Sequence, residues 1–79
     1  MVTIFRESGL RFVIFIDDHA PPHVHVFGDG NAKIELGTNK NEVRIVEAEH
    51  MKNDVIRKAK RIVADRRDEL MVKWVEFHG

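Results

Sequence analysis

The chain has 79 residues, of which 43% are hydrophobic and 33% are charged, and its formal net charge at pH 7 is zero. This length and composition predict one small domain, residues 1–79, and no apolar run approaches the ~20 residues that a membrane-spanning helix needs. The chain has no cysteine, which excludes disulfide bonds and thiolate metal sites. The first residues carry no secretory signal pattern, so we expect a cytoplasmic protein that does not act at a membrane.

The first part of the chain, residues 1–47, has the composition of an antiparallel sheet. Five segments are rich in β-branched, aromatic or alternating apolar residues: 2–6, 10–16, 23–27, 32–36 and 43–47. Glycine and asparagine between these segments are typical of tight turns. The continuous apolar run at 10–16 predicts a strand covered on both faces, with Ile16 in the core. We therefore expect a meander of four or five strands.

Residues 53–78 change to the spacing of an amphipathic helical region. The apolar positions on one face are Val55, Ile56, Ala59, Ile62, Val63, Leu70, Trp74 and Phe77. Asn53 suits the N-cap, and the absence of glycine and proline allows one long helix, but the charged segment 65–68 makes a kink or a break the alternative. We expect Trp74 to fill the core between sheet and helix. The predicted fold is α+β, with the sheet packed on a long or kinked C-terminal helix.

The segment 17–26 is the most unusual part of the chain. It contains three of the five histidines and both prolines, in the order Asp-Asp-His-Ala-Pro-Pro-His-Val-His-Val. In a strand, His23 and His25 point to the same face, with Cβ atoms about 6.5–7 Å apart. His19 lies across the diproline turn, which is stiff because proline fixes its own φ angle. We therefore expect the three imidazoles to converge on one point.

Four kinds of chemistry can be considered for this loop, and the residues agree with three of them. Asp18, His19, His23 and His25 could hold a divalent metal such as zinc, although no cofactor is firmly implied. Alternatively, the same three histidines could catalyse the cleavage of RNA without a metal, as general acid and base. A histidine-triad hydrolase motif would need a third histidine where Phe27 stands. The fourth alternative is structural, with the imidazoles hydrogen-bonded to the loop backbone.

The charges are distributed unevenly along the chain. Residues 52–67 carry seven basic and two acidic side chains, whereas the segments before and after have net negative charge. The candidate binding residues in this block are Arg57, Lys58, Lys60, Arg61, Arg66 and Arg67. Such a block predicts contacts with phosphate or with an acidic partner, and the alternative is an outer helix face that is merely solvated.

Two groups of residues carry a family resemblance. They are Asp18, His19, Pro21, Pro22, His23, His25 and Val26 in the loop, and Arg67, Glu69, Leu70 and Trp74 in the C-terminal segment. In this order the residues resemble a widespread family of small prokaryotic proteins of unknown function. Its members are often encoded beside a second small uncharacterised or helix-turn-helix protein, and they are grouped with toxin–antitoxin components or transcriptional regulators. The resemblance implies the fold and a cognate small protein as partner, but it implies no reaction.

Three functional hypotheses remain from the sequence. The first is a small regulatory or toxin–antitoxin-type protein, not an enzyme, that binds nucleic acid or a protein partner through the histidine loop and the basic helix face. The second is a metal-dependent or metal-free ribonuclease or phosphodiesterase that uses the loop histidines. The third is a structural module for protein interaction. Uncovered sheet edges are also compatible with a homodimer.

Overall fold

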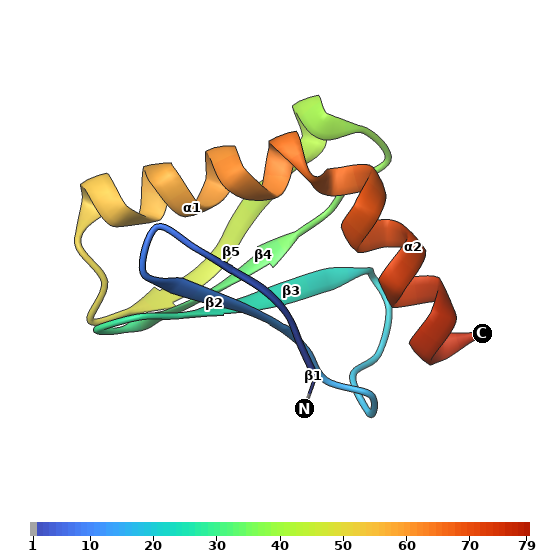
Figure 1. The fold of residues 1–79 in the computed structure, drawn as a ribbon. Coiled ribbons are helices and arrows are strands. Elements are labelled where there is room, and N and C mark those ends of the chain that lie inside the picture. Colours follow the sequence, from blue (N-terminus) through green and yellow to red (C-terminus); the bar gives the residue numbers. More distant parts are fainter. Residues whose placement is uncertain (1) are drawn as a thin grey trace.

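The computed structural model describes residues 2–79, and in it a sheet of five strands is followed by two helices (Figure 1). The elements are β1 (Val2–Glu7), β2 (Leu10–Ile14), β3 (His23–Phe27), β4 (Asn31–Glu35), the short 3₁₀-helix η1 (Lys40–Glu42), β5 (Arg44–Glu49), α1 (Asn53–Asp65) and α2 (Arg67–His78). Each strand pairs antiparallel with the next, in the order β1-β2-β3-β4-β5. The predicted α+β fold with a meander sheet is confirmed.

The hydrophobic core lies between one face of the sheet and the helices. Along β3 the side chains alternate, so that Val24 and Val26 are fully buried on the core side. From α1, Ala59, Ile62 and Val63 complete this core, and α1 runs across that face of the sheet (Figure 1). Each buried aliphatic side chain of this kind contributes about 1.5–3 kcal/mol, so this layer provides much of the folding energy.

The helical region is broken at Arg66, as the alternative prediction had it. Arg66 leaves helical geometry, with φ −111° and ψ 21°, between the end of α1 and the start of α2. One helix over residues 53–78 would be about 39 Å long, whereas the longest extent of the molecule is 33 Å. The break lets α2 turn down beside the end of the sheet (Figure 1), where Leu70 and the predicted core residue Trp74 are buried.

Two local predictions were wrong. Strand β2 ends at Ile14, and Ile16 is 55% exposed instead of buried in the core. The chain leaves the sheet there because Phe15 begins a turn, in which the Asp18 amide donates to the Phe15 carbonyl at 3.2 Å. Asn53 is the first helical residue and not the N-cap, since Lys52 occupies the cap position in extended geometry without a side-chain bond. Neither helix of the described residues is both long and apolar enough to cross a membrane.

Candidate functional site

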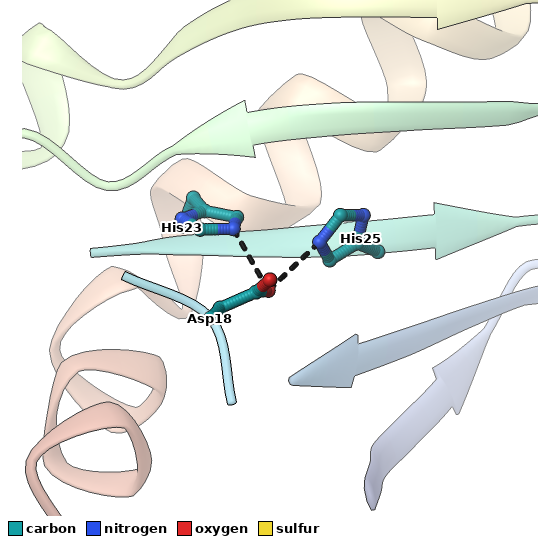
Figure 2. A group of neighbouring side chains, drawn as sticks. All are labelled: Asp18, His23 and His25. Carbon is teal, nitrogen blue, oxygen red and sulfur yellow. Dashed lines mark hydrogen bonds and ion pairs between the residues drawn. The ribbon is translucent and has the colours of Figure 1, made fainter. Parts of the chain in front are cut away.

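Asp18, His23 and His25 form a cluster at the rim of the sheet (Figure 2). His23 and His25 lie two residues apart on β3, so the pleat places both rings on one face. Asp18 comes from the loop between β2 and β3, and its Oδ2 atom lies 2.9 Å from His23 Nε2 and 3.0 Å from His25 Nε2. A single carboxylate oxygen therefore joins the two imidazoles.

The imidazole of His23 is held from both sides. The residue is only 3% exposed, and its ring lies against Trp74 of α2 with 5.2 Å between ring centroids. Its Nδ1 donates to the Pro21 carbonyl oxygen at 2.8 Å, and its Nε2 faces Asp18. Both ring nitrogens therefore face oxygen acceptors. The contact with Asp18 joins a buried imidazole to a carboxylate that is partly exposed.

The pKa values of His25 and Asp18 depend on burial and on the contact between the two side chains. Burial lowers the pKa of His25 below its ordinary value, and the hydrogen bond to Asp18 offsets only part of this effect. Burial acts to raise the pKa of Asp18, but the hydrogen bond from His25 and the nearby charge of His23 outweigh it, so this pKa is lowered. The cluster therefore combines an ionised carboxylate at Asp18 with an imidazole at His25 whose neutral form is favoured by burial.

The predicted convergence of three histidines is realised for two of them. One potential ligand atom each from Asp18, His23 and His25 lies within 4.8 Å of the others, so these three residues could hold a metal ion. His19 does not belong to this group and is exposed on the loop. The loop therefore contributes a carboxylate to the cluster in the place that the sequence suggested for a third imidazole.

Sequence reasoning missed the aromatic contacts around the cluster, which come from Phe15 just before the loop and from Trp74 and His78 on α2. Phe15 meets the His25 ring edge-on, with 4.5 Å between centroids. His78 is half-buried and stacks on Trp74, with 3.7 Å between ring centroids. Its Nδ1 and Nε2 atoms lie 2.8 and 3.1 Å from the carbonyl oxygens of Trp74 and Phe15. No spacing rule connects His78 with a loop some sixty residues earlier, so only the folded chain reveals this contact.

The basic block divides into two groups with different roles. Five side chains are exposed and form no ion pair within residues 2–79: Lys52, Arg57, Lys58, Lys60 and Arg61. Four of them lie on α1 and Lys52 is its N-cap, and together they are called the basic face of α1 below. The predicted binding residues Arg66 and Arg67 are not part of it, because both are partly buried and used within the molecule.

Arg66 and Arg67 stabilise the break between the helices. The Arg66 guanidinium lies 3.4 Å from the centre of the Phe5 ring and pairs with Glu69 and Glu7. Arg67 donates to the carbonyl oxygens of Leu36 and Gly37, which follow β4. These contacts fasten the start of α2 to the sheet, and they leave neither guanidinium free for a phosphate.

The basic face and the histidine cluster lie on different sides of the molecule. α1 covers the face of β3 that carries Val24 and Val26, whereas His25 points to the opposite face. The two groups of candidate residues therefore form two separate sites, and a single ligand of small size cannot touch both.

A comparison with models of protein families matches residues 9–75 to a domain of unknown function, DUF4160. The chain belongs to this family. The match includes the loop with the Asp18 cluster, all of α1 and most of α2. No curated protein and no solved structure matches the chain.

In this DUF4160 chain, the C-terminal residues singled out from the sequence have structural roles. Leu70 and Trp74 are buried in the core, Glu69 pairs with Arg66, and Arg67 holds the loop after β4. Trp74 also packs against His23, so the helix and the histidine loop stabilise each other.

We expect acid to remove the stability that His25 contributes to the metal-free protein. Folding lowers the pKa of His25, so as the pH falls below about 6.5 this imidazole is protonated in the unfolded chain before it is protonated in the folded protein. Acid therefore favours the unfolded chain. The difference in free energy of unfolding between wild type and His25→Gln should therefore be largest above about pH 7 and shrink toward about pH 5. Urea denaturation of both proteins in EDTA at each pH measures this difference. A difference that grows on acidification would contradict the lowered pKa.

Proposed function

We propose that this chain is a small regulatory protein that binds nucleic acid through the basic face of α1. The observation that carries the proposal is four exposed cationic side chains on α1 and a fifth at its N-cap, without ion pairs in the described part of a chain whose net charge is zero. Like charges this close repel one another, so a polyanion that neutralises them lowers the electrostatic free energy of the face.

The spacing of these residues suits a phosphate backbone. Arg57 and Arg61 are one helical turn apart, which places their Cβ atoms about 5–6 Å from each other. Guanidinium groups bind phosphate oxygens through two parallel hydrogen bonds, and Lys58 and Lys60 add point charges beside them. These contacts read no bases, so binding is expected to depend more on charge than on sequence. The chain also resembles a family of unknown function whose members are grouped with toxin–antitoxin components or transcriptional regulators, which is compatible with a regulatory role.

The geometry favours binding over phosphodiester cleavage by the loop histidines. The polar atoms of Asp18, His23 and His25 are bonded to one another, and the Asp18 and His25 side chains are only 27% and 21% exposed. A nucleic acid on the basic face of α1 would lie on the other side of the sheet from these imidazoles. His19, the third residue proposed for catalysis, does not reach the cluster.

The proposal is tested by fluorescence anisotropy with a labelled DNA duplex and a labelled single-stranded RNA. For the duplex, the logarithm of the association constant should fall with the logarithm of salt concentration by about 0.9 per phosphate contact. The double variant Arg57→Ala/Arg61→Ala should bind at least about tenfold more weakly and reduce this slope by about two.

A matched control removes two charges elsewhere. Arg6 on β1 and Lys73 on α2 lie outside the basic face, so Arg6→Ala/Lys73→Ala makes the same change in net charge. This control should bind within about twofold of wild type. Affinity that does not change with salt, or an equal loss in both double variants, would refute nucleic-acid binding by α1. An acidic protein partner would instead show salt-sensitive binding while both nucleic acids fail to bind.

A further inference from the structure

We propose that Asp18, His23 and His25 bind one divalent transition-metal ion of the Zn²⁺ type. The structure brings Asp18 Oδ2, His23 Nε2 and His25 Nε2 together on one side of the sheet rim (Figure 2). Two imidazoles and one carboxylate are a donor set that first-row divalent metals accept, and zinc sites with three protein ligands use it. The site is separate from the basic face of α1 and extends beyond the proposed binding of nucleic acid.

The two distances from the Asp18 oxygen fit such an ion, and the three ligand atoms all lie within 4.8 Å of one another. An ion held at about 2.0–2.1 Å by each ligand requires neighbouring donor atoms about 2.9–3.4 Å apart, for angles between octahedral and tetrahedral values. The Asp18 oxygen lies 2.9 Å from His23 Nε2 and 3.0 Å from His25 Nε2. The backbone therefore already delivers all three groups to one place, and side-chain rotation has to bring the two imidazole nitrogens into range of one ion.

The environment of His23 also resembles that of a metal ligand. Its Nδ1 donates to the Pro21 carbonyl oxygen, which fixes the ring orientation and leaves Nε2 directed at Asp18. Metal-binding histidines commonly donate their second ring N–H to a carbonyl or carboxylate in this way. The packing against Trp74 holds the same ring in place from the other side. This preorganisation lowers the entropic cost of binding an ion.

Coordination of the ion changes which ring nitrogens of His23 and His25 carry hydrogen. An ion coordinated by Nε2 of His23 takes the place of the hydrogen that this atom donates to Asp18, and that proton leaves to solvent. The neutral His25 moves its N–H from Nε2 to Nδ1 and coordinates through Nε2, without net release. Asp18 remains ionised and offsets one charge of the ion. Because Asp18 and His25 are partly exposed, water can complete the coordination shell.

The test uses untagged full-length protein, stripped of metal with EDTA and dialysed. Calorimetric titration with Zn²⁺ should show one ion per chain with a dissociation constant below about 10 μM. Co²⁺ should give visible absorption bands of bound metal at the same stoichiometry. Asp18→Asn and His25→Gln, at partly exposed positions, should each weaken Zn²⁺ binding at least about 100-fold, with a circular dichroism spectrum like that of wild type.

His19→Gln is the matched control, because it removes an exposed histidine of the same loop that lies outside the cluster. It should bind Zn²⁺ within about threefold of wild type. Absence of saturable binding to wild type, or unchanged affinity in Asp18→Asn and His25→Gln, would overturn the assignment. A loss in His19→Gln as large as that in His25→Gln would also overturn it. None of these variants touches α1, so nucleic-acid binding can succeed or fail independently.

Discussion

His23→Ala should lower the free energy of unfolding by about 2–4 kcal/mol, because it removes a buried imidazole that is hydrogen-bonded at both ring nitrogens. The truncation leaves the Pro21 carbonyl oxygen without its donor and takes one of two partners from Asp18. It also opens a cavity against Trp74, where the imidazole now packs. Because the residue is only 3% exposed, water replaces these contacts poorly.

Urea denaturation in EDTA measures this loss without any contribution from bound metal. His19→Ala provides the comparison, since His19 is exposed in the same loop and its truncation should change stability by less than about 0.5 kcal/mol. If His23→Ala and His19→Ala unfold at the same urea concentration, His23 does not hold the loop to the helix. The imidazole would then be free to serve chemistry alone, as the enzyme hypothesis required.

Gly30→Ala should cost about 3 kcal/mol, the upper end of the penalty for overpacking. Gly30 lies in the turn between β3 and β4, and a Cβ atom there would come within 2.3 Å of the carbonyl oxygens of Glu49 and His50. These atoms belong to the backbone at the end of β5, so the clash is relieved only by separating β5 from the turn. Loss of pairing between β4 and β5 is therefore expected along with the loss of stability.

Gly28→Ala is the control for this substitution within the same turn. A Cβ atom at Gly28 would lie 2.8 Å from Cδ2 of Leu10, which is the end of a flexible side chain that can rotate away. We expect a cost below about 1 kcal/mol, measured by thermal or urea unfolding beside Gly30→Ala. Equal costs at both glycines would show that the backbone contact at Glu49 and His50 does not limit the turn.

The predicted sheet was accurate where local chemistry decides the outcome. The alternation from His23 to Phe27 correctly separated the core face from the face of the histidines, because the strand period is fixed by backbone geometry. The break in the helical region was predicted only as an alternative. Propensity allows residues 65–68 to be helical, and the size of the molecule decides against it. The end of β2 at Ile14 was missed because apolar composition does not show where a chain leaves its sheet.

In the candidate site, too, local spacing predicted one part of the arrangement and tertiary contacts decided the rest. Spacing along one strand correctly placed His23 and His25 together, but it could not decide between Asp18 and His19, which are adjacent in the loop. A loop is set by the contacts at its ends, here the turn at Phe15 and the bonds to His23. The basic block was visible as a run of charges, yet two of its arginines are used internally.

By itself, the sequence determined the order of strands and helices, the faces of β3 and the concentration of positive charge near residues 52–67. These features depend on interactions within a few residues, which repeat with the periods of strand and helix. Only the tertiary structure decided that Asp18 joins the two imidazoles, that Trp74 packs against His23 and also stacks on His78, and that the charged helix lies on the opposite side. Those relations arise from packing between segments far apart along the chain, which local propensities do not encode.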